Sequence, residues 1–186
     1  MGPPRTVLLR NAAGSLMVLA VLLAVAAGLP ALNRILPDGL AVDAGPYGVG
    51  AGVTLLPPPG AQLDAARTRP GPERGIAMFT LDGVRYVVVV DRFGGSLPDA
   101  AERLRRKITQ TAGYQLTDAE QPTATAAGVV GTRGTYTSPD RRGGYAVFIA
   151  HGLVVELTVS GPEVQITRIA GAIDASIASV TFQAPR

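Results

Sequence analysis

The sequence predicts an α+β protein: one domain with an antiparallel sheet of about six strands and two packed helices, preceded by an N-terminal transmembrane helix. Three observations lead to this prediction. Tight-turn pairs interrupt apolar runs at Asp82-Gly83 and His151-Gly152, which is typical of β-hairpins. Two later segments carry apolar residues at helical spacing. Residues 12–32 contain no charged side chain.

The uncharged run at residues 12–32 is long enough to cross a membrane. At ~1.5 Å per residue it reaches about 30 Å, the thickness of a hydrocarbon core. It also lacks the polar stripe of a water-facing helix. However, Ala24-Val25-Ala26 fits a cleavage site, so a removed signal peptide is the alternative to a retained anchor.

Charges beside the run predict its orientation. Arg5 and Arg10 precede it, whereas Asp38 and Asp43 follow soon after Arg34. Positive flanks stay in the cytoplasm. We therefore expect a single-pass protein of the cell membrane, held in the lipid by this helix, with its C-terminal domain outside the cytoplasm.

The rest of the chain divides by composition. Residues 1–11 form the cytoplasmic N-terminus, 33–46 a linker, 47–182 the extracytoplasmic domain and 183–186 a tail. The domain is folded, because 47% of the chain is hydrophobic and only 17% is charged. The absence of cysteine excludes disulfides and thiolate metal sites.

Strand patterns fill most of the domain. Strands are expected at residues 50–56, 76–81, 84–91, 114–117, 129–137, 145–150 and 153–159, with a terminal strand or tail at 180–182. The run of valines after Tyr86 is apolar on both faces, which predicts a central strand covered on both sides. Residues 139–144 read as a hairpin loop.

Two helices are expected between and after these strands. Ser96 and Asp99 fit a capping box for the first, whose apolar face includes Leu97, Leu104 and Ile108. Ser160 and Glu163 suggest the same arrangement for the second. The buried stripe of the second helix is expected to contain Ile166, Ile169, Ala170, Ile173 and Ile177.

This order resembles the PsbP-like fold. The residues that carry the resemblance are Val53-Thr54-Leu55-Leu56-Pro57, Thr125-Ala126-Ala127-Gly128, the hairpin at 145–159 and Ser179-Val180-Thr181-Phe182. Together they span residues ~46 to 182. The resemblance implies a non-enzymatic binding or assembly module. The arginine bias and the anchored layout look like those of actinobacterial envelope proteins.

Residue patterns that carry catalysis are weak in this sequence. His151 is the single histidine, and its place in a two-residue turn favours a conformational role. Gly48–Gly52 and Gly128–Gly134 contain glycine-rich patterns, but neither precedes a helix in the way a phosphate loop does. We predict no catalytic residue, no metal ligand and no cofactor. An exported carboxylate-dependent hydrolase and an accessory subunit of a membrane complex remain as alternatives.

Basic residues are the remaining candidates for binding. Every basic residue except Lys107 is an arginine, a side chain suited to phosphate and carboxylate. The candidates are Arg103, Arg105, Arg106 and Lys107 on the first helix, and Arg67, Arg69 and Arg74 in the loop at residues 57–75. They are interpreted as a solvated face, with Glu102 paired to Arg106, or as a surface for anionic lipid, an envelope ligand or an envelope protein. Nucleic acid is not an expected partner.

Overall fold

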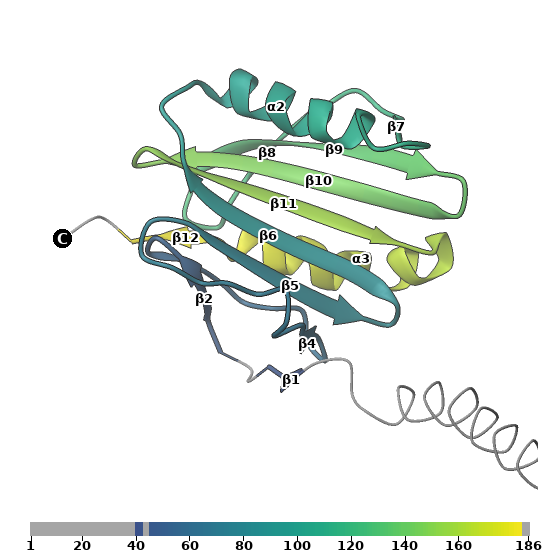
Figure 1. Ribbon diagram of the computed structural model, residues 1–186, viewed down its shortest axis with the longest axis horizontal. Coiled ribbons are helices and arrows are strands. Elements are labelled where there is room, and N and C mark those ends of the chain that lie inside the picture. Colours follow the sequence, from purple (N-terminus) through teal and green to yellow (C-terminus); the bar gives the residue numbers. More distant parts are fainter. Residues whose placement is uncertain (1–39, 43–44, 184–186) are drawn as a thin grey trace, which may run out of the picture. The chain divides into compact units, whose positions relative to one another are not determined.

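A computed structural model describes residues 40–42 and 45–183 (Figure 1). The predicted transmembrane helix at 12–32, most of the predicted linker and residues 184–186 lie outside this part of the chain. Within the described residues, no helix is both long and apolar enough to span a bilayer. The described residues belong to one structural unit.

The larger sheet contains nine antiparallel strands. They are β1 (Leu40–Ala41), β4 (Gln62–Leu63), β5 (Gly75–Leu81), β6 (Val84–Arg92), β7 (Gln115–Leu116), β8 (Gln121–Ala124), β9 (Val130–Ser138), β10 (Arg141–Ala150) and β11 (Leu153–Gly161). Their order is β1-β4-β5-β6-β11-β10-β9-β7, and β8 also pairs with β9. A smaller sheet has the order β12-β3-β2, with β2 at Tyr47–Gly50, β3 at Val53–Leu55 and β12 at Thr181–Phe182.

The predicted fold class is confirmed, but the predicted number of strands is too small. The described residues form two antiparallel sheets and two helices, α2 (Leu97–Thr109) and α3 (Glu163–Ala178). The additional strands, such as β1 and β4, are only two residues long. Such short segments carry no readable alternation. β4 is a strand because it pairs with the longer β5. β1 lies within the predicted linker and pairs with β4.

Both predicted two-residue turns are present. Asp82 and Gly83 have φ of 50° and 76°, and His151 and Gly152 have φ of 53° and 72°. These left-handed conformations are those that a tight hairpin turn requires. β6 lies between β5 and β11, as the sequence predicts for a central strand, and its Tyr86, Val88 and Val90 are buried on one face. Val87 and Val89 on the other face are only half-buried, so the predicted covering of both faces is incomplete.

Three predicted boundaries are wrong. The expected strand at residues 50–56 is divided, because a turn at Ala51-Gly52, both with positive φ, separates β2 from β3. Residues 141–144 are not loop but the start of β10, because Gly143 pairs with Tyr136 on one side and Ser160 on the other. The second helix does not begin with a capping box at Ser160. That residue stays in β11, where its Oγ accepts a hydrogen bond from Arg141 Nε at 3.1 Å, and α3 begins after Pro162 without a side-chain cap.

The first helix begins as predicted. The Ser96 side chain accepts from the Asp99 backbone N–H, and the Asp99 side chain accepts from the Ser96 backbone N–H. Hydrogen bonds from Ser96 lower the pKa of the Asp99 carboxyl. The bond from the Ser96 side chain has the larger effect, and the bond from the Ser96 backbone N–H adds to it.

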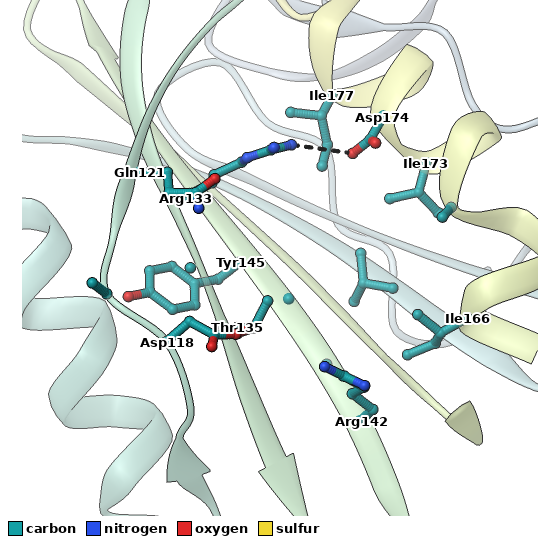
Figure 2. A pocket seen from close by; sticks show the side chains of 16 residues that line it. Asp118, Gln121, Arg133, Thr135, Arg142, Tyr145, Ile166, Ile173, Asp174 and Ile177 are labelled. Atoms are coloured by element: carbon teal, nitrogen blue, oxygen red, sulfur yellow. Dashed lines mark hydrogen bonds and ion pairs between the residues drawn. The ribbon is translucent and has the colours of Figure 1, made fainter. Parts of the chain in front are cut away.

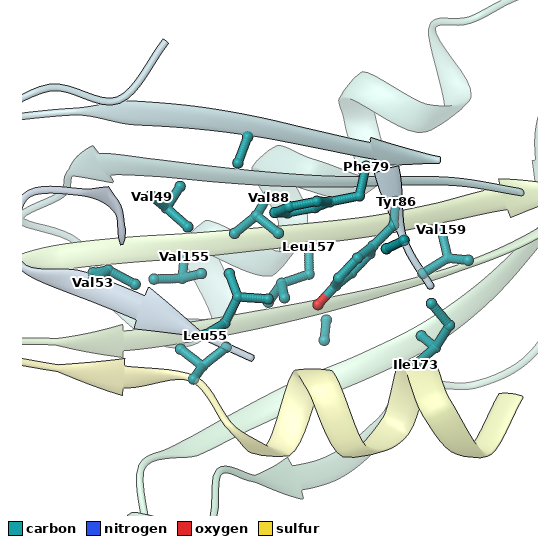
Figure 3. Packing of buried hydrophobic residues seen from close by; sticks show 14 of the residues in the cluster. Val49, Val53, Leu55, Phe79, Tyr86, Val88, Val155, Leu157, Val159 and Ile173 are labelled. Carbon is teal, nitrogen blue, oxygen red and sulfur yellow. The ribbon is translucent and has the colours of Figure 1, made fainter. Parts of the chain in front are cut away.

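The larger sheet has a hydrophobic core on each face. Along β10, Ala146 and Phe148 belong to the main core, whereas Tyr145 and Val147 belong to a second core under α2. The main core fills the space between this sheet, α3 and the smaller sheet, as Figure 3 shows for Val53, Leu55, Tyr86 and Ile173. In Figure 1, α2 and α3 accordingly lie on opposite sides of the sheet.

A buried serine ties three elements of the main core together. Ser176 Oγ of α3 lies 2.6 Å from the carbonyl oxygen of Leu56 and 3.3 Å from the Tyr86 hydroxyl of β6. Burial raises the pKa of Tyr86. These contacts fix α3 across the sheet, and the position of α3 in turn creates the cavity described next.

Candidate groove between α3 and the sheet

A groove of about 600 Å³ runs between α3 and strands β9 and β10 (Figure 2). We call it the α3 groove. Its third side is the segment at residues 118–121, which leads into β8. The volume is within the range of small-molecule sites in proteins, which are concave and mostly apolar.

One wall of the α3 groove is a row of apolar side chains. Ile166, Ala170, Ile173 and Ile177 recur at intervals of three and four residues, so they share one face of α3. The sequence predicts all four in the buried stripe, but only Ile173 is buried. Ile166 and Ile177 are half-buried, and Ala170 is exposed. The half-buried isoleucines therefore offer apolar surface to a ligand.

The sheet forms the floor of the α3 groove, and glycines of β9 and β10 in this floor leave space above it. Gly144 of β10 pairs with Thr135 of β9, so both positions lie on the same face of the sheet. A Cβ atom added to Gly144 would have its nearest neighbour, the Gly134 carbonyl oxygen, at 3.6 Å, which is an ordinary contact. Space that a side chain would normally fill is open at this position.

An ion pair joins the sheet to α3 at each end of the α3 groove. Arg142 of β10 reaches Glu163 at 2.6 Å, and Arg133 of β9 reaches Asp174 at 3.7 Å. Figure 2 shows Arg133 extending to Asp174, and Arg142 near Ile166 at the other end. All four side chains are at least half exposed. Exposed pairs of this kind contribute little to stability, so a ligand can replace them at small cost.

The side opposite α3 is polar. Asp118 accepts hydrogen bonds from the Thr135 and Thr117 hydroxyls. On the opposite face of the sheet, under α2, the Tyr145 hydroxyl donates to Glu120 at 2.8 Å. Burial, together with this bond to Glu120, raises the pKa of Tyr145. The phenol therefore stays protonated and acts as a donor to Glu120.

A smaller polar pocket of about 330 Å³ lies beside the Arg142 end. Its lining includes Arg142 and Glu163, which form the ion pair at this end of the α3 groove. The other lining residues include Thr117, Thr137 and Ser138. The α3 groove thus leads from an apolar row to a polar end at Arg142.

Comparison with known proteins identifies the fold. No family model matches the sequence, and no curated protein matches it. Among solved structures, the solution structure of cyanobacterial PsbP (CyanoP) from Synechocystis sp. PCC 6803 matches with a TM-score of 0.53 and 14% sequence identity. The match covers 81% of this chain and 99% of that chain. The chain has a PsbP-like fold.

The predicted resemblance to the PsbP-like fold is therefore confirmed, and at this identity the likeness concerns the fold alone. A crystal structure from Bacteroides thetaiotaomicron VPI-5482 also matches, with 12% identity and a TM-score of 0.39. That match covers 79% of this chain and 49% of the other, and its TM-score is below the level of a shared fold.

In this PsbP-like domain, the basic residues predicted on the first helix make ion pairs with acidic residues. Arg103 and Lys107 each reach Glu156 of β11 at 2.8 Å. Arg105 and Arg106 both pair with Glu102, and the Arg106 distance is 4.0 Å. The predicted pair between Glu102 and Arg106 is thus confirmed. Arg103 also lies 4.6 Å from the centre of the Phe93 ring.

Glu156 is a feature that the sequence prediction missed. Its side chain is only 4% exposed, and buried carboxylates need charged or hydrogen-bonding partners. Arg103 donates to it through Nε and Nη2, and Lys107 donates through Nζ. The alternation of β11 places Glu156 on the face opposite the main core. The sequence did not show that α2 covers this face.

The loop arginines lie in another segment of the PsbP-like domain. Arg67 pairs with Asp64 at 2.7 Å, and this partner lowers the pKa of the Asp64 carboxyl. Arg69 donates to the carbonyl oxygens of Ala65 and Thr68, and Arg74 is exposed. Neither these arginines nor those of α2 line the α3 groove.

The α3 groove itself was not predicted from the sequence. The sequence predicts that the isoleucines of α3 are buried and that Gly143-Gly144 lies in a loop. Among the described residues there is no group of three or more His, Cys, Asp and Glu residues arranged to hold a metal ion. His151 lies in the turn between β10 and β11.

Proposed function

We propose that this chain is a non-catalytic binding or assembly module of the cell envelope, anchored by its N-terminal segment with the PsbP-like domain outside the cytoplasm. The observation that carries the binding role is the α3 groove. It combines an apolar wall, an open floor at Gly144 and exposed ion pairs at both ends. The uncharged run at residues 12–32 supports the anchored location.

The polar groups of the α3 groove favour binding over catalysis. Asp118 accepts from two threonine hydroxyls, and Asp174 pairs with Arg133. Hydroxyl and guanidinium donors already lie against both carboxylates. The role supported here is therefore to hold a ligand.

A carboxylate-dependent hydrolase is the second candidate, because Asp118 and Asp174 lie on opposite sides of the same groove (Figure 2). Paired carboxylates across a cleft are the arrangement of glycosidases. Replacing both with asparagine separates the two roles: a hydrolase loses turnover, whereas a binding module retains its ligand. A further candidate, an accessory subunit of a membrane complex, rests on the N-terminal segment alone.

The binding role predicts that a small neutral diazirine carrying an apolar ring will label the α3 groove. The full chain is placed in phosphatidylcholine vesicles and irradiated, and modified peptides are mapped by mass spectrometry. We expect labelling in β9, β10 and α3, because apolar ligands enter concave apolar sites. Ala170→Phe, which fills the groove from its exposed wall, should remove this labelling.

Ala175→Phe is the matched control, because Ala175 is an equally exposed alanine of α3 outside the groove lining. Equal labelling of the two variants would contradict the proposed binding site. Circular dichroism of both variants checks that the fold is retained.

The anchored location predicts that the full chain stays in the membrane pellet after a carbonate wash. A spanning helix is held by its apolar length and not by charge, so alkaline washing does not release it. Immunoblotting of pellet and supernatant measures the distribution. A soluble form beginning near Ala27 would show cleavage of the N-terminal segment instead.

A further inference from the structure

We propose that the α3 groove binds a single-chain anionic amphiphile, with its alkyl chain along the isoleucines of α3 and its acidic head at Arg142. This inference rests on the proposed binding role and names the class of ligand. The apolar wall and the polar end are separate observations, and an amphiphile is the ligand that satisfies both.

The wall of the α3 groove fits an alkyl chain. Ile166, Ile173 and Ile177 face it from α3, and Gly144 leaves space on the sheet side. Burying methylene groups against such side chains is favourable. Removal of this half-exposed apolar surface from water is the driving force for binding.

Arg142 fits an acidic head group. Its described hydrogen bond is a single one, from Nη1 to Glu163 at 2.6 Å. The guanidinium has five N–H donors, so further donors are available to a carboxylate or phosphate. The adjoining polar pocket, with the hydroxyl side chains of Thr117, Thr137 and Ser138, gives such a head group a hydrated location.

A peptide fits the α3 groove less well than an alkyl chain. Each peptide unit brings an N–H and a C=O group that require partners when buried. The β9 backbone beside the groove is already paired with β10 and β8, and the Thr135 carbonyl accepts from the Thr117 N–H. The groove therefore presents the face of a sheet and not a free edge, so strand addition is not available there.

The length of the α3 groove limits the chain. From Ile166 to Ile177 the helix rises about 16 Å at ~1.5 Å per residue. Each ~1.5 Å bond of a zigzag alkyl chain advances it by only about 1.25 Å, so about 14 carbons cover this length. The pair between Arg133 and Asp174 marks the far end, so longer chains gain little further contact.

The experiment uses the full chain in phosphatidylcholine vesicles with a photoreactive, alkyne-tagged dodecanoate. We expect the groove strands and α3 to be labelled, and unlabelled dodecanoate to compete more strongly than dodecanol. Arg142→Gln should reduce that preference about tenfold, since it removes a charge-assisted hydrogen bond. Ala170→Phe should abolish labelling, and Ala175→Phe should leave it unchanged.

The outcomes separate this inference from the proposed function. If the neutral diazirine labels the groove but dodecanoate does not, or if dodecanol competes equally well, the anionic amphiphile is excluded while the binding role stands. If neither probe labels the groove, both are wrong. If Arg142→Gln leaves the preference for dodecanoate over dodecanol unchanged, Arg142 is excluded as the head-group site.

Discussion

Val88→Asp is expected to leave the domain unfolded. Val88 is fully buried in β6, between β5 and β11, and it belongs to the main core. A carboxylate at this position has no cationic partner in the core, and burying an unpaired charge costs several kcal/mol. Domains have a total stability of only about 5–15 kcal/mol. Circular dichroism should therefore show no cooperative thermal transition.

Val164→Asp is the matched control for this prediction. Val164 is 71% exposed in the first turn of α3, where a negative charge interacts favourably with the helix dipole. This variant should melt at or slightly above the temperature of the parent. If Val88→Asp unfolded at the same temperature as Val164→Asp, β6 would not be a buried central strand.

Gly75→Ala should give the second largest loss of stability. β2 of the smaller sheet contacts β5 at Gly75, and a Cβ atom added there would lie only 1.9 Å from the Val49 carbonyl oxygen. The obstacle is backbone and not a flexible side chain, so the two sheets must move apart. Such overpacking costs about 1–3 kcal/mol, and backbone contact places this site at the upper end. Urea denaturation monitored by tyrosine fluorescence measures the change.

Gly171→Ala serves as the control, because a Cβ atom at this exposed position of α3 meets nothing within 4 Å. Alanine in a helix interior should raise the free energy of unfolding by about 1 kcal/mol. A Gly75→Ala variant as stable as the parent would show that the main core does not depend on this close contact.

The long strands and the first helix could be predicted because their signals are local. The Asp82-Gly83 and His151-Gly152 turns require positive φ, and the capping box of α2 depends on residues three positions apart. β7 at Gln115–Leu116 lies within the predicted strand at 114–117, but β4 and β8 could not be predicted, since they are strands only because they pair with the longer β5 and β9. Local sequence does not contain that information.

The candidate site was less predictable than the fold. The spacing of Ile166 and Ile177 identifies one face of α3, but it does not say how completely the sheet covers that face. The basic residues of α2 were assigned from their polarity, whereas the position of Arg103 depends on Glu156, which lies far along the chain. Sites formed between distant segments need the three-dimensional arrangement.

The pairing of β6 with β11 affects how the chain folds while it is being synthesised. Synthesis proceeds from the N-terminus, so the β5–β6 hairpin emerges well before β11 at Leu153–Gly161 exists. During this interval the valine-rich β6 has a free edge, and unpaired apolar strand edges favour association with other chains. Pairing across such a separation is also slow. The nascent protein therefore has to keep β6 away from neighbouring chains until its last third has been synthesised.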